Sequence, residues 1–585
     1  MSRIFKKKNV PNSVELQRVK HLPRRKWEDY PEELTELLSE AYCRKVAGFR
    51  EMTLRPVQAA ALADLHDYRG LFGPISVGSG KTLINFLAPA VLESQRPLTL
   101  IPAKLRSKTE TEWYRLSKHW RLPTMRIESY AKVSRDPHLI ENYRPDLIFA
   151  DEGHRLKNTK AAVTKRVKRY VEAVKAGKID GVSEVVIAVV SGTLTTESLL
   201  DYWHLMRWSL GEDKMPLPAK WNDVMDWADC IDVKKSGSRT APGALAELCT
   251  REERKNLALG GEVAVKTIRN AYRRRLHETP GVVATSTAGV ACSLVIDTVD
   301  IPLDNRLDSH FKQLRDLWQT PDGWDFTQPI DLWRHARELA CGFYNVWDPR
   351  PPEDWLEARR LWKKWVRETL KHSRTLDTDM QVAQACKDGI LNPVENGVHL
   401  YQQWVDIRDS FEPNTVPVWV DDSAIRFAID WLNNHDGICW TEHPCVGEAI
   451  AEYGGFPYFG RGGVDRLTGE TIEETSARRV IASVQSNGEG RNLQRWNRNL
   501  VLSCVPNGKV LEQLLGRCHR PGQKADTVYY TFVQSVAEHV TGFNHAIKQA
   551  KYIETTTGQP QKLLYADRST MSLMDLANKQ GWRWG

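Results

Sequence analysis

The chain has 585 residues, of which 41% are hydrophobic and 27% are charged, and its net charge is +8. This composition is that of a soluble globular protein with several domains. No apolar run reaches the roughly 18 residues that cross a membrane, so we expect no membrane partner. The ten Cys form no CxxC pair, which indicates reduced thiols and a cytoplasmic location. The positive charge suits a polyanionic partner such as nucleic acid, although many basic proteins bind none.

Residues 1–50 are predicted to be a basic lead-in that ends in one amphipathic helix. From 51 to 275, short apolar strands alternate with helical segments, and a helical excursion begins at about 210. The clearest strands are "LTLI", "LIFAD" and "VVIAVVS". Alternation of this kind predicts a parallel sheet that helices cover on both faces.

The second half repeats the pattern after an interruption. Residues 276–415 are predicted to be a helical, Trp-rich linker or insertion. Residues 416–567 alternate again, with the strands "VPVWV", "GICWT", "RVIASV", "NLVLSCV" and "TVYYTFV", and 568–585 form a tail. The predicted fold class is therefore α/β, with two doubly wound parallel-sheet lobes.

A glycine-rich turn, "GSGKT", follows a short apolar stretch and opens a helical segment. Gly78 and Gly80 let the backbone turn its N–H groups, with that of Ser79, toward phosphate oxygens. Lys81 supplies positive charge for the outer phosphates, and Thr82 supplies a hydroxyl for Mg2+. The full GxxxxGKT pattern is not met, because position 75 is Ile. A chance glycine-rich turn is the alternative interpretation of this stretch alone.

Two adjacent carboxylates end the apolar strand in "DLIFADEGHRLKN". Negative charges at a strand end repel each other and are costly to desolvate, unless a cation is bound there. We expect Asp151 to hold Mg2+ and Glu152 to orient and deprotonate the attacking water of a nucleotide hydrolase. An exposed acidic turn that caps a helix is the alternative.

Two arginines in "EQLLGRCHRPGQ" are three residues apart on a predicted helix and should share one face. Across a cleft from a triphosphate, Arg517 and Arg520 would neutralise the charge that develops in the transition state, as arginine fingers do. In isolation, a solvated basic helix face is the more common role of such a pair.

Six stretches in this order resemble the motifs of superfamily 2 DNA helicases and translocases of the SWI/SNF type. They are "LRPVQAAAL", "LTLIPAKLRSKTETEW", "ADEGHRLKN", "VVSGTLTTESLLDYWHLMRW", "SNGEGRNLQRWNRNLVLSCVPN" and "EQLLGRCHRPGQ". The resemblance implies two RecA-like lobes, ATP and Mg2+ as ligands, and a catalytic role for Gln513. It also implies that Gln58 reads adenine and that His154 and Gly490 line the nucleotide site.

The sequence departs from the resemblance at several positions. Leu194 stands where the family usually has Pro, Arg491 stands where it has Leu, and "VPNG" replaces Asp-Trp-Asn-Pro. We see no histone-reading module either. These features resemble the compact members that bacteriophages and bacteria carry, for which replication or recombination proteins are expected partners in the bacterial cytoplasm.

The leading hypothesis is an ATP-driven motor on double-stranded DNA. A strand-separating or fork-remodelling helicase is the first alternative, and a nucleotide-dependent DNA-binding loader or scaffold is the second. Backbone contacts would suffice for a motor, because phosphates repeat regardless of sequence. We expect such contacts from Lys104, Arg106, Ser129 and Asn492.

Two further stretches bear on DNA binding and on strand separation. In "PEDWLEARRLWKKWVRETLKH", Trp355, Trp362 and Trp365 repeat at helical spacing, which favours a buried stripe. The basic residues between them form either a DNA-binding face or a solvated surface. The aromatic stretch "YGGFPYFGRGG" is the nearest candidate for a strand-separating wedge, and we predict a strand and a loop there instead.

Overall fold

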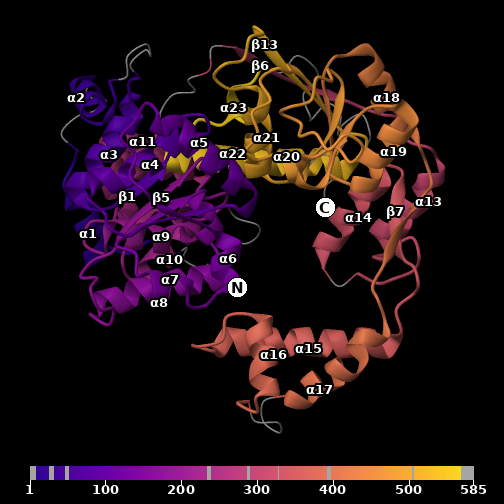
Figure 1. Cartoon of the computed structure of the whole chain (residues 1–585), viewed down its shortest axis with the longest axis horizontal. Coiled ribbons are helices and arrows are strands. Elements are labelled where there is room, and N and C mark those ends of the chain that lie inside the picture. Colours follow the sequence, from indigo (N-terminus) through magenta and orange to yellow (C-terminus); the bar gives the residue numbers. More distant parts are fainter. Residues whose placement is uncertain are drawn as a thin grey trace, which may run out of the picture.

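The computed structural model describes residues 8–25, 32–45, 52–233, 239–285, 290, 292–326, 328–391, 397–503 and 506–567. The predicted tail at 568–585 lies outside these ranges. The predicted α/β class is confirmed, because the chain forms two parallel sheets with helices around them. We call the region of the first sheet the N-lobe, that of the second the C-lobe, and residues 351–414 the arm (Figure 1).

The N-lobe sheet has the order β1-β5-β4-β2-β3, and all its strands are parallel. The strands are β1 (Leu71–Pro74), β2 (Pro97–Ile101), β3 (Arg126–Ser129), β4 (Leu147–Asp151) and β5 (Val186–Ser191). Alternate residues of β4 enter different cores: Ile148 and Ala150 join one apolar cluster, whereas Leu147 and Phe149 join another. Both faces of the sheet are therefore covered, as the apolar runs predicted.

Helices between these strands cover the sheet, three more precede the first strand, and one follows the last. They are α1 (Val14–His21), α2 (Glu32–Tyr42), α3 (Pro56–Tyr68), α4 (Lys81–Val91), α5 (Arg106–Ser117), α6 (Tyr130–Arg135), α7 (Leu139–Tyr143), α8 (Ala162–Lys175) and α9 (Trp203–Leu210). The predicted amphipathic helix of the lead-in is α2, whereas α1 was not foreseen. The excursion from about 210 contains α10 (Trp221–Ile231), α11 (Glu253–Leu257) and α12 (Gly261–His277).

The C-lobe sheet has the order β10-β11-β9-β12-β13-β6 and is also parallel. Its strands are β6 (Ser293–Val299), β9 (Ile438–Thr441), β10 (Tyr458–Phe459), β11 (Val480–Ser483), β12 (Arg498–Val501) and β13 (Thr527–Val533). Its helices are α18 (Ser423–Asn434), α19 (Pro444–Gly454), α20 (Val484–Asn487), α21 (Gly508–Cys518), α22 (Ala537–Thr557) and α23 (Lys562–Tyr565).

The predicted boundaries of the linker at 276–415 need correction at both ends. Gly281 and Val283 hydrogen-bond to Phe72, so the chain after α12 still extends the N-lobe sheet. β6 pairs with β13 along its whole length and belongs to the C-lobe sheet. The strand predicted from "VPVWV" exists as β8 (Thr415–Trp419), but it pairs antiparallel with β7 (Phe343–Trp347) in a separate two-stranded sheet.

The helical segment between β6 and β9 has two parts with separate apolar clusters. The first contains α13 (Arg306–Lys312) and α14 (Pro329–Ala340) and packs beside the C-lobe. The second is the arm, with α15 (Glu353–His372), α16 (Asp379–Lys387) and α17 (Val398–Ile407). Trp355 and Trp362 are buried against α17, so the predicted Trp stripe is an apolar core face. None of the described helices combines the length and apolarity needed to cross a lipid bilayer.

Candidate active site

The glycine-rich turn lies between β1 and α4 and has the geometry that the sequence predicts. Gly78 and Gly80 adopt φ of 89° and 81°, in the left-handed region that favours glycine, and Lys81 begins α4. The Lys81 Nζ donates to the backbone oxygens of Ile75 at 3.2 Å and Ser76 at 3.3 Å. The loop thus curls around a lysine ammonium, and Thr82 follows on the first turn of the helix.

Gln58 is buried on α3 directly beside this loop. Its Nε2 donates to the oxygen of Gly80 at 2.9 Å, and its Oε1 accepts from the backbone N–H of Arg55 at 2.8 Å. A Cβ on Gly80 would lie 2.3 Å from Gln58 Nε2, so only glycine allows this approach. Gln58 therefore braces the loop, and its predicted reading of adenine stays a prediction.

The acid pair lies at the end of β4, next to β5. Asp151 accepts from the N–H of Glu152 at 3.0 Å, and the Tyr130 hydroxyl donates to the Asp151 backbone oxygen at 2.7 Å. Burial, together with the adjacent Glu152 charge, raises the pKa of Asp151 to about 7. Glu152 has φ 53°, a left-handed conformation that costs a non-glycine residue free energy and is concentrated at functional sites.

Glu152 belongs to a small polar network with His154 and Ser191. The Ser191 hydroxyl donates to Glu152 Oε2 at 3.1 Å, and His154 Nδ1 lies 2.9 Å from Ser191 Oγ and 3.3 Å from Glu152 Oε2. Burial lowers the pKa of His154 to about 4, so the ring is neutral at pH 7. Burial acts to raise the pKa of Glu152, but the His154 hydrogen bond and the Lys81 charge outweigh it, so this pKa is lowered and Glu152 stays ionised.

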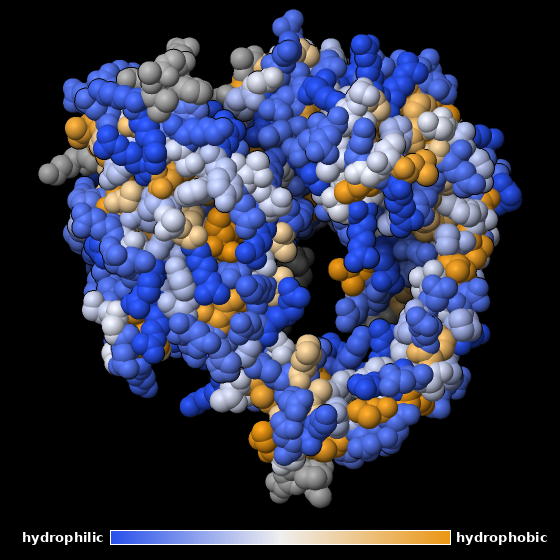
Figure 2. Space-filling model, in the orientation of Figure 1, coloured by the Kyte–Doolittle hydropathy of each residue, from blue (hydrophilic) through white to orange (hydrophobic). Residues whose placement is uncertain are grey.

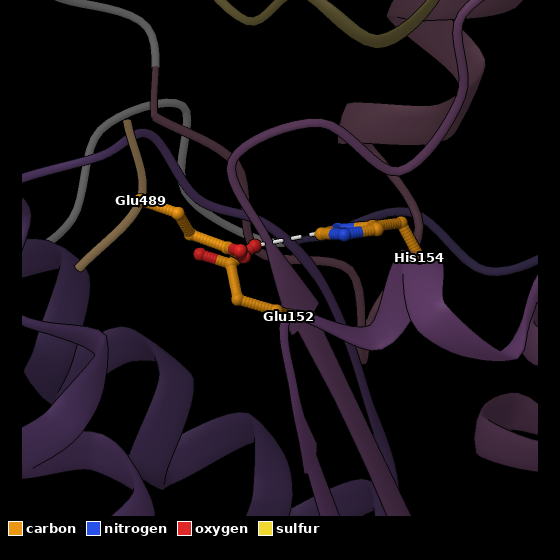
Figure 3. A group of neighbouring side chains, drawn as sticks. All are labelled: Glu152, His154 and Glu489. Atoms are coloured by element: carbon orange, nitrogen blue, oxygen red, sulfur yellow. Dashed lines mark ion pairs between the residues drawn. The ribbon is translucent and has the colours of Figure 1, made fainter. Parts of the chain in front are cut away.

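The C-lobe contributes Glu489 to the same place, as Figure 3 shows. One ligand atom each of Glu152, His154 and Glu489 lies within 4.8 Å of the others. Glu489 also forms ion pairs across the interface with Lys104 at 2.9 Å and Arg155 at 2.7 Å. Since two cations already balance its charge, we interpret Glu489 as a contact between the lobes and not as a metal ligand.

Oxygen donors that suit Mg2+ are found in Asp151, next to Glu152, and in Thr82 of α4. Mg2+ prefers oxygen ligands to imidazole, and Asp151 and Thr82 offer a carboxylate and a hydroxyl beside the phosphate-type loop. Among the described residues, no Lys, Arg or His lies within ion-pair distance of the half-buried Asp151 carboxylate, although the Lys81 charge acts on it, so Asp151 can balance a further cation. The residues present therefore fit the predicted ion.

The two predicted arginines come from the end of α21. Arg517 lies in its last turn, but the helix ends at Cys518, so the prediction that Arg520 shares a helix face with it is wrong. Both side chains nevertheless donate to the same oxygen, that of Arg491, at 3.1 Å each. The Arg517 Nε also donates to the oxygen of Gln513 at 2.7 Å. Burial, together with the Arg517 charge, lowers the pKa of Arg520 to about 10.

The interface brings the arginine-bearing segment close to the glycine-rich loop. A Cβ on Gly516 would lie 3.5 Å from Val77, and one on Gly78 would lie 3.4 Å from Pro521. A small cavity lies here, lined by Arg55, Ser76, Val77, Gly78, Ser79, Val290, Pro521, Pro560, Lys562 and Tyr565. It is therefore bounded by the loop on one side and by the C-lobe on the other.

Sequence reasoning missed three charged residues of this interface. They are Glu489, Arg155 and Lys509, a residue of α21 whose pKa burial lowers to about 8 although the Glu152 charge opposes it. Glu489 and Arg155 stand inside motif stretches, between residues that were singled out. The available signal is that Glu489 and Arg155 are oppositely charged residues inside two of the motif stretches.

The four predicted DNA contacts lie at the ends of β2 and β3 and after α20. Lys104 and Arg106 are exposed, but Lys104 is paired with Glu489, and Arg106 with Glu110 at 3.0 Å. Ser129 is buried and its hydroxyl caps α6 by accepting from Lys132 N at 3.1 Å. Asn492 is exposed beside Gly490, which contacts Leu105. Their contact with DNA stays a prediction.

The chain was also compared with known proteins. No protein-family model matches it, and no curated protein matches it either. Interpretation of the site therefore depends on its own residues and geometry.

Proposed function

We propose that the chain is an ATP-driven motor that moves on double-stranded DNA and hydrolyses ATP between two RecA-like lobes. One observation carries the proposal. A glycine-rich loop and a strand-end acid pair from one parallel sheet lie opposite two arginines, Arg517 buried and Arg520 half-buried, that follow a strand of the other sheet. Nucleotide hydrolases need these groups on both sides of a triphosphate.

Each residue has a defined task in this proposal. Lys81 neutralises the outer phosphates, while Asp151 and Thr82 would hold Mg2+, which supplies further positive charge to the phosphate oxygens. Glu152 accepts a proton from the attacking water, and its lowered pKa keeps it ionised for this role. Arg517 and Arg520 turn from the Arg491 oxygen toward the charge that develops on the transferred phosphoryl group.

A chain of hydrogen bonds offers a route from the chemistry to the relative position of the lobes. The Ser191 hydroxyl contacts Glu152, and its backbone oxygen accepts from Gln559 Nε2 of the C-lobe at 3.1 Å. Gln559 is completely buried, so it cannot shift without moving its surroundings. Changes at Glu152 during hydrolysis would therefore reach the C-lobe through Ser191.

The substrate and setting are also part of the proposal. The motor moves on duplex DNA, which it holds through the phosphates. It acts in the bacterial cytoplasm, as is expected for the compact phage and bacterial proteins that the motifs resemble. A strand-separating helicase built on the same site is the second candidate. A loader without sustained hydrolysis is disfavoured, because Lys81, Glu152 and Arg520 are all present.

The decisive experiment measures ATPase rates with no nucleic acid and with single-stranded DNA, duplex DNA, forked DNA or RNA. We expect the largest stimulation with duplex DNA, and it should fall steeply with salt because counterions are released on binding. Lys81→Ala is the control for contaminating ATPases. Stimulation by RNA alone, or equal rates under all five conditions, would overturn the proposal.

A further inference from the structure

The arm closes a ring. It leaves the C-lobe side of the molecule at β7, returns at β8, and places its far end beside α8 of the N-lobe (Figure 1). In the space-filling view an opening remains between the two lobes and the arm (Figure 2). The contact between α8 and the segment that joins α15 to α16 closes the ring of protein around this opening.

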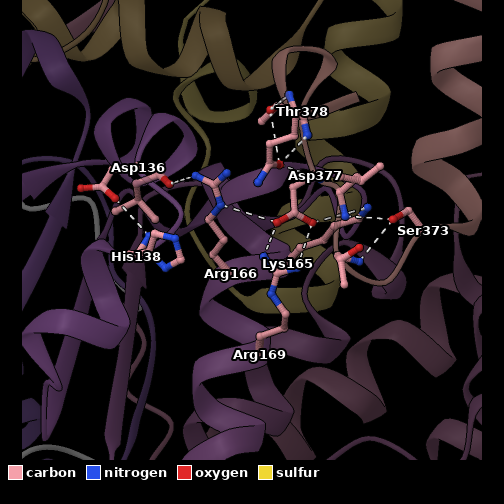
Figure 4. Close-up of polar contacts among 12 residues, drawn as sticks. Asp136, His138, Lys165, Arg166, Arg169, Ser373, Asp377 and Thr378 are labelled. Atoms are coloured by element: carbon pink, nitrogen blue, oxygen red, sulfur yellow. Dashed lines mark hydrogen bonds and ion pairs between the residues drawn. The ribbon is translucent and has the colours of Figure 1, made fainter. Parts of the chain in front are cut away.

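This contact, which we call the latch, is centred on Asp377 (Figure 4). The Asp377 side chain is only 1% exposed, although it lies at the far end of the arm. Arg169 binds both of its oxygens, Arg166 Nε lies 3.5 Å away and Lys165 Nζ lies 3.8 Å away. Lys165 also donates to the oxygen of Leu370 at 3.0 Å. One carboxylate of the arm thus meets three cations of a single N-lobe helix.

The latch is polar, and this makes it reversible. The apolar cluster of the arm contains Trp362, Val366, Val382 and Cys386 but no described residue of the N-lobe. The arm therefore keeps its own core whether it touches α8 or not. The cost of desolvating buried charges offsets much of their attraction, so closure is held without being permanent.

The side of α15 that faces the opening carries both acidic and basic residues, and two of its cations have no acidic partner among the described residues. Trp355 and Trp362 bind α17, which Figure 1 places on the far side of α15 from the opening. At about 100° per residue, Lys364 and Arg367 point to the side opposite these tryptophans. Both are exposed, and neither has a carboxylate within 4.0 Å among the described residues, whereas neighbouring Arg360 and Lys371 do. Cations without an acidic partner, on the side of the opening, are suited to bind the phosphate backbone of DNA.

We propose that the arm is a gate that encloses DNA: the latch opens to admit a duplex sideways and closes behind it, so that the protein is linked to DNA topologically. The proposal rests on the proposed function for the identity of the track. The antiparallel β7–β8 pair carries both ends of the arm, and on the N-lobe side the arm touches α8, so the β7–β8 pair is the natural hinge.

The test measures dissociation without nucleotide, so that movement along DNA plays no part. Protein is bound to a closed DNA circle, to the same DNA linearised, or to the linear form with both ends blocked by bound streptavidin, and excess competitor DNA is added. A closed ring slides off free ends only. We expect release from the circle and from the blocked form to be at least about tenfold slower than from the free linear DNA.

Variants of the latch link this behaviour to its residues. Asp377→Lys should make release from the circle as fast as from linear DNA, and the charge exchange Asp377→Lys with Arg169→Glu should restore slow release. Asp388→Lys, which makes the same charge change at an exposed position on the far end of α16, is the matched control. Circular dichroism shows whether the Asp377→Lys variant is folded. If it is not, the release rates of the double variant Asp377→Lys with Arg169→Glu decide the test.

The outcomes separate the two proposals. Equal release from all three DNA forms, in a protein whose ATPase is stimulated by duplex DNA, would refute the gate and leave the motor intact. A protein that binds none of the DNA forms and shows no stimulated ATPase would overturn both.

Discussion

At the scale of single residues, Lys81 and Glu152 should fail in different ways. Lys81→Ala removes the charge that neutralises the phosphates, so ATP binding and hydrolysis should be lost together. Glu152→Gln keeps an oxygen that can accept from Ser191 but cannot take a proton. We expect it to bind ATP and to hydrolyse it about 10²–10⁴-fold more slowly. Fluorescent nucleotide titration with single-turnover hydrolysis separates these effects, and a native rate in Glu152→Gln would remove its role as a base.

Arg520 should matter for turnover and not for affinity. In this structure it donates to the oxygen of Arg491 and must rotate to reach a nucleotide. Arg520→Ala should therefore keep most of the ATP affinity and lose DNA-stimulated turnover by about 10³-fold, the lower range for an arginine finger. Arg479→Ala, which removes a surface ion pair with Asp436, is the control. Strong acceleration of Arg520→Ala by duplex DNA would assign the role to another residue.

The site residues that could be predicted are those whose role follows from their immediate sequence neighbours, such as Lys81 in its loop and Asp151 at the end of its strand. The sequence did not predict Arg155 with Glu489, because these partners are 334 positions apart and meet only when both sheets have formed. It placed Arg520 on a helix that ends two residues earlier, since the end of a helix depends on capping and packing as well as on sequence pattern.

At the scale of elements, Gly490 of the C-lobe lies against η1 (Ala103–Leu105) of the N-lobe. A Cβ on Gly490 would lie 2.1 Å from Leu105 Cδ2, and its φ is 80°. Gly490→Ala must displace the Leu105 side chain at the contact between the lobes, and we expect this to lower turnover by about 10²-fold, as a misplacement of about 1 Å can. Gly469→Ala is the control, because Gly469 has a φ of 74° with nothing within 4 Å of its Cβ position. Equal rates in the two variants would show that the contact has no role.

Asp232, at the end of α10, links the excursion to α22 of the C-lobe. It accepts from the Tyr552 hydroxyl at 3.0 Å and from the N–H of Leu199 at 2.9 Å, and burial raises its pKa to about 6. The folded chain therefore binds this proton more tightly than the unfolded chain. The resulting stability, about 3 kcal/mol, is present below pH 4 and lost as the pH rises through 6.

Asp232→Asn removes this proton equilibrium. Thermal unfolding of the variant and the parent at pH 4.5 and pH 7 measures the effect. We expect the melting temperature of the variant, relative to that of the parent, to rise with pH across this interval. A constant difference between the two proteins would show that Asp232 does not titrate in this range.

Strands of both sheets were predictable where both faces are buried, because such strands read as continuous apolar runs. β6 was missed because its pattern is interrupted by Asp297 and Thr298 and its partner β13 lies far along the chain. β8 was recognised as a strand but assigned to the wrong sheet, since a strand pattern carries no information about its neighbour.

At the scale of the whole molecule, the proposed motor should move on duplex DNA without separating its strands. Opening each base-pair step costs about 1.4 kcal/mol of stacking, and unwinding enzymes use a wedge for this. The aromatic candidate forms β10 and a loop as predicted, but its first two residues end α19. Tyr458 and Phe459 are buried, so neither can act as a wedge, and the exposed Tyr453 belongs to the helix. We expect displacement of the third strand from a triplex and little opening of a blunt duplex. Efficient separation of a long blunt duplex without triplex displacement would support the helicase alternative.

The pairing of β6 with β13 also has a consequence for how the chain is made. The N-lobe sheet comes from one continuous stretch and can form while synthesis continues, whereas β6 must wait until β13 leaves the ribosome. At about 5–20 residues per second, this wait is on the order of ten seconds or more. Leu294 and Ile296, buried in the finished protein, stay exposed during that time. The arm, which has its own core, is synthesised in the interval and is the part of the second half best able to fold first.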